Sequence, residues 1–206
     1  MQLPPFVYII EDDRAVRESL ALWLGMRSRQ CRTFDSCEAF LGEARPEMRG
    51  CAIVDIRMEG MSGLDLQREL GQRGVMLPLI FITGHGDAAT AREALKGGAF
   101  DFVEKPIDND MLAGLVTAAL EEDERRAAGV AKALQLKERM ARLTQREREV
   151  MERVVAGKHN REIAAELGIS ARTVEVYKAR LMDKLDVRRV PDLVRLVLAD
   201  EPPSTP

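Results

Sequence analysis

The chain of 206 residues has few cysteines, few aromatic residues and no long apolar run. Its three cysteines, Cys31, Cys37 and Cys51, are odd in number and lack Cys-x-x-Cys spacing, which argues against a disulfide framework and a zinc site. No apolar run approaches the roughly 18–20 residues that span a bilayer. The start, MQLPPFVYII, also lacks the features of a secretory signal. We therefore expect a cytoplasmic protein without a membrane segment.

The charge is nearly balanced overall but uneven along the chain. The formal net charge is −3, yet residues 1–120 carry 13 basic against 18 acidic residues, whereas residues 144–199 carry 12 against 9. An acidic N-terminal region followed by a basic C-terminal region is typical of a regulatory domain joined to a domain that binds a polyanion. The excess of positive charge in the second region is small, so this asymmetry is only a first indication.

The first 121 residues alternate short apolar runs with amphipathic stretches. The runs predict strands at 6–10, 30–34, 51–54, 79–82 and 100–103. Helical spacing occurs near 15–26, 36–43, 63–71, 87–97 and 108–120. Runs that are apolar throughout indicate strands covered on both faces, as in a parallel sheet. Five such β/α units predict a doubly wound, five-stranded, flavodoxin-like domain at 1–121.

Residues 122–138 are charged and rich in alanine, and they predict a helical linker. The favoured interpretation is a helix exposed to solvent. The alternative is a helix that faces a partner, or a short coiled coil, in which an apolar stripe would bury itself. The residues of that stripe would be Leu134, Leu136, Met140 and Leu143.

Residues 139–204 predict a second domain made only of helices. Residues with N-cap chemistry stand at three helix starts, at Thr144, Asn160 and Ser170. Thr144 and Glu147 form a capping box, and Pro191 opens a fourth helix. The tail at 201–206 is expected to be disordered.

Polar side chains follow the predicted strands at their carboxyl ends. Glu11 and Asp12 follow the first strand and Asp55 ends the third, while Thr83 and Lys105 follow the fourth and fifth. These ends meet at one edge of a parallel sheet. Carboxylates gathered there repel one another and favour a hard divalent cation such as Mg²⁺. A lysine and a hydroxyl would complete a cradle for a phosphoryl group, with a central aspartate as the nucleophile.

Each of these residues alone has an ordinary structural explanation. Asp13 is interpreted as a helix cap, and an isolated Thr-Gly or Lys-Pro pair is usually a turn. His85, which stands close by in the sequence, is interpreted as a surface loop residue. The functional interpretation depends on the combination, in which each group ends its own strand in the same sheet.

A helix-turn-helix is predicted in the second domain. Helices at 160–167 and 171–185, joined by Gly168-Ile169-Ser170, have its spacing. An ordinary αα-hairpin is the alternative. We expect these residues to face inward: Ile163, Ala164, Leu167, Val174, Tyr177 and Leu181, with Val176 uncertain. The cations of the second helix favour DNA binding: Arg172, Lys178, Arg180 and Lys184.

Four stretches of the first domain resemble the receiver domain of two-component response regulators: YIIEDDRAVRESL, VDIRMEGMSGLDL, FITGHGD and GAFDFVEKP. The resemblance implies that Asp55 accepts a phosphoryl group from the histidine of a sensor kinase. It implies that Mg²⁺ is bound by Glu11, Asp12, Asp55 and the backbone carbonyl of Arg57.

The same resemblance implies a switch on the neighbouring strands. Thr83 would contact the phosphoryl group, with Lys105 as its ion pair and a cis peptide bond between Lys105 and Pro106. Phe102 would be the aromatic residue that responds to Thr83. One departure from the family pattern is Glu59, which stands where proline is usual and adds a negative charge near the pocket. Glu59 is expected to affect the choice of kinase or the lifetime of the phosphate.

The second domain resembles the LuxR-type DNA-binding domain through LTQREREVMERVVAGKHNREIAAELGISARTVEVYKARLMDKLDV. The whole chain is similar to the NarL/FixJ family, and within it to FixJ-type members. The resemblance implies that the helix at 171–185 enters the major groove. The expected DNA-contacting residues are Ser170, Arg172, Thr173, Val174, Glu175, Lys178, Ala179 and Lys184.

Together these features predict a transcription factor, an activator rather than an enzyme, that is switched by phosphorylation of Asp55. Its expected partners are a sensor histidine kinase, double-stranded promoter DNA, RNA polymerase and a second copy of the chain. One alternative keeps DNA binding but makes the receiver a constitutive or ligand-sensing dimerisation module. The other is a haloacid-dehalogenase-like phosphatase, which needs a second aspartate where Arg57 stands.

Overall fold

The computed structural model describes residues 4–84 and 88–198, and the side chains of residues 88–90 are not described. His85 and the tail at 201–206, for which the sequence makes predictions, lie outside the described residues. The chain divides into two compact units, Met1–Ala127 and Ala128–Pro206. Each unit has its own hydrophobic core, and each is described here by itself.

Five parallel strands form the sheet of the first unit, in the order β2-β1-β3-β4-β5. Their bounds are β1 (Phe6–Ile10), β2 (Cys31–Phe34), β3 (Gly50–Asp55), β4 (Leu79–Gly84) and β5 (Asp101–Lys105). The predicted doubly wound parallel sheet is confirmed. Because β1 and β3 lie side by side, their carboxyl ends bring residues 11 and 55 to the same edge.

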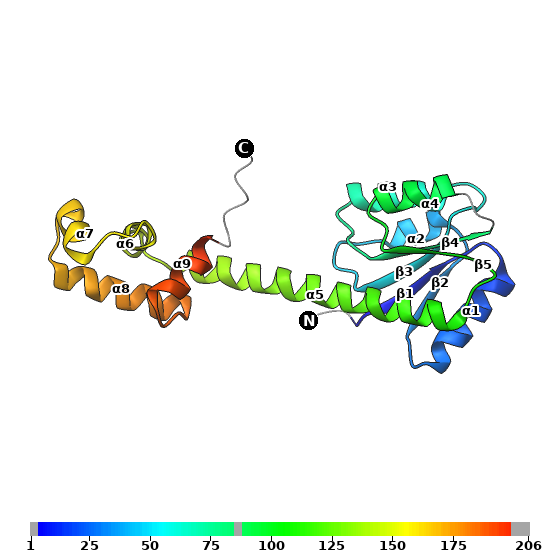
Figure 1. Ribbon diagram of the computed structural model, residues 1–206, viewed down its shortest axis with the longest axis horizontal. Helices are drawn as coiled ribbons and strands as arrows, with labels where there is room; N and C mark the ends of the chain where they lie inside the picture. Colours follow the sequence, from blue (N-terminus) through cyan, green and yellow to red (C-terminus); the bar gives the residue numbers. More distant parts are fainter. Residues whose placement is uncertain (1–3, 85–87, 199–206) are drawn as a thin grey trace. The chain divides into compact units, whose positions relative to one another are not determined.

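Helices cover both faces of this sheet. Their bounds are α1 (Arg14–Met26), α2 (Cys37–Glu43), α3 (Gly63–Gln72), α4 (Ala88–Lys96) and α5 (Asn109–Ala141). Helices α1 and α5 lie on one face, and α2, α3 and α4 lie on the other (Figure 1). Successive β1 residues alternate between the two cores: Val7 and Ile9 face α1 and α5, whereas Tyr8 and Ile10 face the opposite helices.

Three strands extend beyond the ends that the sequence predicts, β3 by one residue at each end and β4 and β5 by two residues at their carboxyl ends. β4 continues to Gly84 and β5 to Lys105, where Thr83 pairs with Glu104 and Gly84 with Lys105. Backbone hydrogen bonds do not depend on side-chain polarity, whereas the prediction ends each strand at its last apolar residue. Asp55, Thr83 and Lys105 are therefore part of the sheet, whereas Glu11 and Asp12 follow the end of β1.

Helix α5 runs for 33 residues, from Asn109 to Ala141, through the stretch predicted to be a helical linker. It contains no proline, and Gly129 does not interrupt it. Asp123 is the last fully buried residue of α5, and it forms an ion pair of 2.7 Å with Arg49. In the parts of the chain that the structure describes, no helix is both long and apolar enough to cross a membrane.

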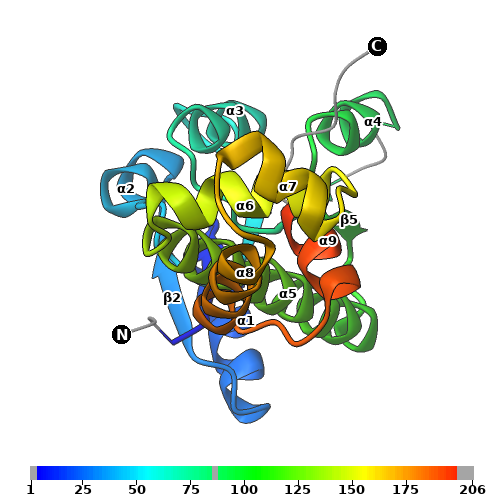
Figure 2. The same ribbon diagram turned by 90° about the vertical axis from the view of Figure 1, so that its left-hand side faces the viewer.

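Four further helices form the second unit around one core (Figures 1 and 2). They are α6 (Gln145–Val155), α7 (Asn160–Leu167), α8 (Ala171–Leu185) and α9 (Val190–Leu198). The predicted caps at Thr144 and Ser170 are confirmed. The predicted cap at Asn160 is wrong. His159 has the extended cap conformation instead, because its backbone N–H is held by the Glu162 carboxylate at 2.6 Å, so Asn160 becomes the first helical residue.

Gly50 gives a test of how closely β1 and β3 approach. A Cβ atom at Gly50 would lie 1.8 Å from the carbonyl oxygen of Phe6, and its φ is +120°. We expect Gly50→Ala to lower the free energy of unfolding by at least about 2 kcal/mol, measured by urea denaturation. The matched control is Gly114→Ala, in an open position of α5, which should stabilise by about 0.5–1 kcal/mol. An unchanged midpoint for Gly50→Ala would contradict the packing.

Candidate acidic pocket and candidate nucleic-acid interface

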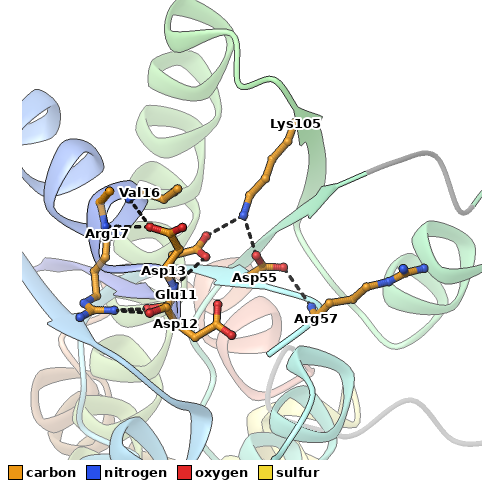
Figure 3. A network of polar contacts seen from close by, with 9 residues as sticks. Glu11, Asp12, Asp13, Val16, Arg17, Asp55, Arg57 and Lys105 are labelled. Atoms are coloured by element: carbon orange, nitrogen blue, oxygen red, sulfur yellow. Dashed lines mark hydrogen bonds and ion pairs between the residues drawn. The ribbon is translucent and has the colours of Figure 1, made fainter. Parts of the chain in front are cut away.

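Three charged groups meet at the carboxyl edge of the sheet (Figure 3). The Lys105 ammonium donates to Glu11 Oε2 at 2.9 Å and to Asp55 Oδ2 at 2.6 Å. The other Asp55 oxygen accepts the backbone N–H of Arg57 at 2.9 Å. Glu11 is 2% exposed and Asp55 is 6% exposed, so the lysine compensates two buried carboxylates. The Lys105–Pro106 peptide bond is cis, as the resemblance implies.

Asp12 completes an acidic cluster that is open to solvent on one side. Ligand atoms of Glu11, Asp12 and Asp55 all lie within 4.8 Å of one another, and Asp12 is exposed. The Arg17 guanidinium fixes the backbone here, since it donates to the carbonyl oxygens of Glu11 at 2.6 Å and Asp12 at 3.0 Å. Three carboxylates against one ammonium leave an excess of negative charge on hard oxygen donors. That donor set fits a divalent cation such as Mg²⁺.

The environment raises the pKa of two of these groups, Glu11 and Lys105. Burial raises the pKa of Glu11, and the nearby Asp55 adds to the rise, although the hydrogen bond from Lys105 opposes it. Burial alone would lower the pKa of Lys105, but its hydrogen bonds to Asp55 and Glu11 outweigh burial and raise it. Lys105 is therefore held in its charged form beside the central aspartate.

Asp13 does not belong to this cluster. Its carboxylate accepts the backbone N–H groups of Ala15 at 2.8 Å and Val16 at 3.1 Å and caps α1. The interpretation of Asp13 as a helix cap is confirmed.

Thr83 and Phe102 occupy neighbouring strands beside the pocket. Thr83 is 4% exposed on β4, and within the described residues its hydroxyl forms no hydrogen bond with Asp55 or Lys105. Phe102 is half-buried on β5 and packs against the core under α2, α3 and α4. The structure thus places both residues near the pocket without joining them to Asp55.

Glu59 lies on an open depression of about 660 Å³ next to the cluster. Asp12, Asp13 and Asp35 line the same depression. The loop that carries Glu59 is attached to α2, because the Glu38 carboxylate accepts the backbone N–H of Met61 at 2.8 Å. Glu59 therefore adds negative charge beside Asp12.

The exposed side of α8 forms the candidate nucleic-acid interface. Four residues on one side of this helix line an open depression of about 580 Å³: Arg172, Glu175, Val176 and Ala179. Val176, whose orientation the sequence leaves uncertain, is 44% exposed. Val174, which the sequence places both among the inward-facing residues and among the DNA contacts, is 0% exposed and packs in the core. Its inward orientation is confirmed, and its burial argues against a contact with DNA. Helical geometry turns these two neighbouring valines to different sides.

The cations of α8 fall into two groups. Arg172, Lys178 and Arg180 form no ion pair or hydrogen bond with another described residue. Lys184 instead binds the Glu147 carboxylate at 2.6 Å and the carbonyl oxygen of Arg142 at 3.2 Å. Its charge is already compensated, which argues against the predicted role of Lys184 in DNA binding.

Glu147 is the polar residue that joins α6 to α8. Its carboxylate also accepts the backbone N–H of Thr144 at 2.8 Å and the Thr144 hydroxyl at 2.9 Å. Although burial opposes it, the bonds from Lys184 and Thr144 lower the pKa of Glu147. At the start of α8, the Ser170 hydroxyl accepts the N–H of Thr173 at 3.0 Å.

One basic hollow was missed by reasoning from the sequence. It has a volume of about 520 Å³ and is lined in part by Lys158, His159, Arg161 and Lys178. Arg161 has no hydrogen-bond or ion-pair partner among the described residues, whereas Lys158 is paired with Glu166. The run Lys158-His159-Asn160-Arg161 at the start of α7 was the signal available in the sequence.

Family models match both regions of the chain. Residues 7–117 match the response regulator receiver domain, and residues 141–197 match the luxR family of bacterial regulatory proteins. The chain is 44% identical over 200 residues to the transcriptional regulatory protein FixJ of Azorhizobium caulinodans, covering 93% of this chain and 91% of that protein. It is 42% identical over 193 residues to FixJ of Rhizobium meliloti, covering 94% and 95%.

Solved structures give the same result. The response regulator StyR aligns with a TM-score of 0.87 at 37% identity, covering 96% of this chain and 100% of that one. Full-length FixJ from B. japonicum aligns with a TM-score of 0.58 at 39% identity, covering 95% and 97%. A receiver domain joined to a luxR-family DNA-binding domain defines the class of response regulators that control transcription. The chain belongs to the NarL/FixJ family of that class.

The acidic cluster predicts stabilisation by Mg²⁺. A cation that binds only the folded state at 100 times its Kd should add about 2.7 kcal/mol to the free energy of unfolding, measured by thermal denaturation with and without MgCl₂. Asp12→Asn should lose most of this gain. Asp35→Asn, in the neighbouring depression but outside the cluster, should keep it. An equal loss in both variants would contradict a site centred on Glu11, Asp12 and Asp55.

Proposed function

We propose that this response regulator is switched by phosphorylation of Asp55. The observation that carries the proposal is the setting of the Asp55 carboxylate. It is 6% exposed, bound by the Lys105 ammonium at 2.6 Å and by the Arg57 N–H at 2.9 Å, and adjacent to the carboxylates of Glu11 and Asp12. A buried aspartate among groups that orient it and compensate its charge is suited to act as a nucleophile.

In the proposed reaction, an Asp55 oxygen attacks the phosphorus of a phosphohistidine on a sensor kinase. The new O–P bond forms as the N–P bond to the imidazole breaks, and the imidazole leaves. Lys105 offsets the charge of the phosphoryl oxygens, and the Arg57 N–H orients the carboxylate. Glu11, Asp12, Asp55 and the Arg57 carbonyl would hold Mg²⁺, which when bound supplies further positive charge to the phosphoryl group.

The proposed response passes through Thr83 and Phe102. The Thr83 hydroxyl turns to the phosphoryl oxygens, and the half-buried Phe102 moves into the space that this change opens. A shift from 1:99 to 99:1 between two states needs about 5.5 kcal/mol of differential stabilisation. A few charge-assisted hydrogen bonds to the phosphoryl group supply much of that. Two phosphorylated receivers then pair and bring two DNA-binding domains to a two-fold-related site.

Helix α8 is proposed to enter the major groove. Its open side and its uncompensated cations support this docking, as does the hollow that contains Arg161. We retain Ser170, Arg172, Thr173, Glu175, Lys178 and Ala179 as DNA-contacting residues and leave out Val174 and Lys184. Most cationic contacts in protein–DNA complexes are with phosphates.

The wider assignments follow from this function. We propose a receiver at 1–121, a helical linker at 122–138 and a DNA-binding domain at 139–204, which activates transcription through RNA polymerase. A regulator of chromosomal genes acts where the DNA is, so we place it in the cytoplasm. Glu59 is proposed to influence phosphate lifetime or kinase choice, through the charge that it adds beside Asp12.

Phosphorylation of Asp55 can be tested directly. Incubation with acetyl phosphate and Mg²⁺ should give an acid-labile phosphoprotein, visible as a shifted band on a phosphate-affinity gel. Asp55→Asn should show no shift, because the acceptor oxygen is lost. Asp110→Asn, an exposed aspartate of α5, is the matched control and should be labelled normally. Labelling of Asp55→Asn to the wild-type level would refute the proposal.

The docking of α8 predicts a separation between phosphorylation and DNA binding. Lys178→Ala should weaken binding to a selected DNA site by roughly tenfold, because a phosphate contact is lost, while Asp55 is still phosphorylated. Lys132→Ala removes an exposed lysine of α5 and should bind as the wild type does. Gel-shift titration measures both. Equal affinity of Lys178→Ala and wild type would rule out the proposed docking.

A further inference from the structure

A carboxylate stands at the centre of the exposed side of α8. Glu175 lies between Arg172 and Ala179 in the depression of about 580 Å³, with Val176 beside it. Glu175 is exposed and forms no ion pair or hydrogen bond with another residue that the structure describes, although Arg172 is only one turn away. The middle of the proposed DNA-facing surface therefore carries an uncompensated negative charge.

A carboxylate that faces DNA is repelled by the phosphates on both sides of the groove. It is favourable only where it accepts a hydrogen bond from a base. In the major groove, such donors are the N4 amino group of cytosine and the N6 amino group of adenine. Guanine presents two acceptors there, and thymine presents an acceptor and a methyl group, so both should be rejected.

Cytosine fits Glu175 better than adenine does. The adenine N6 amino group lies between two acceptors, its own N7 and the O4 of the paired thymine, and both repel the second carboxylate oxygen. The cytosine N4 amino group has an acceptor on one side only, the O6 of the paired guanine. The residues around Glu175 agree with a base-reading role. Val176 and Ala179 are small and apolar, which suits contact with thymine methyl groups, and neither supplies a competing cation.

We infer that Glu175 is a specificity-determining residue that selects cytosine in each half-site by accepting a hydrogen bond from its N4 amino group. This inference rests on the proposed docking of α8 in the major groove. It differs from the proposed role of Lys178, whose charge attracts any sequence through the phosphates.

The test is selection of binding sites from random double-stranded DNA by the full chain, phosphorylated with acetyl phosphate and Mg²⁺. Single-base variants of the selected site are then titrated. For the wild type, one position in each half-site should require cytosine, and its replacement by guanine or thymine should weaken binding roughly tenfold. Glu175→Ala should lose this preference at that position alone.

Glu175→Gln gives the sharper result, because an amide both donates and accepts and therefore matches N7 and N6 of adenine. Its preference at the same position should change from cytosine to adenine. The matched control is Glu152→Gln, an exposed residue of α6 that removes the same charge from the same unit. Its affinity can rise for all sequences, but its base preferences should match the wild type.

Three outcomes would overturn the inference. If Glu175→Gln binds specifically with wild-type preferences at every position, Glu175 does not read a base, while the proposed function stands. If the wild type requires adenine rather than cytosine at the affected position, the assignment to the N4 amino group fails. If the phosphorylated wild type selects no sequence, the proposed function fails together with the inference.

Discussion

The ion pairs of Lys105 with Glu11 and Asp55 hold together the edge of the sheet on which the function of the receiver depends. They join the ends of β5, β1 and β3, which come from distant parts of the chain. The two carboxylates are almost completely buried, and removing the ammonium would leave them desolvated and mutually repelling. The same contact holds the Asp55 carboxylate in place, which the proposed function requires for an incoming phosphoryl group.

In the second unit, one cation of α8 forms a comparable ion pair, whereas the other cations of that helix do not. Lys184 forms an ion pair with Glu147, and this contact connects the last turn of α8 to the start of α6. Arg172, Lys178 and Arg180 have no such partner among the described residues, and in the proposed function their charges attract DNA. Charge content alone would assign all four cations to DNA. The buried side of the helix decides which one serves the fold.

Most of the fold was predictable because its apolar periodicity is strong. Strands covered on both faces are apolar throughout, and the amphipathic helices between them have clear spacing, so the parallel sheet follows. Errors occur where local rules compete. β5 extends through Glu104 and Lys105 because the backbone continues to pair with β4, and α7 begins at Asn160 because Glu162 caps the His159 N–H instead.

The sequence by itself determined the domain classes, the order of the elements and the set of groups at the strand ends, because these depend on periodicity and on residue type at fixed positions. Only the tertiary structure decided how those groups are partnered. It paired Lys184 with Glu147 while Lys178 of the same helix has no such partner, exposed Val176, and left Glu175 without a cation. Neighbouring residues of one type differ in this way because their backbone directions, set by packing, turn them toward different surroundings.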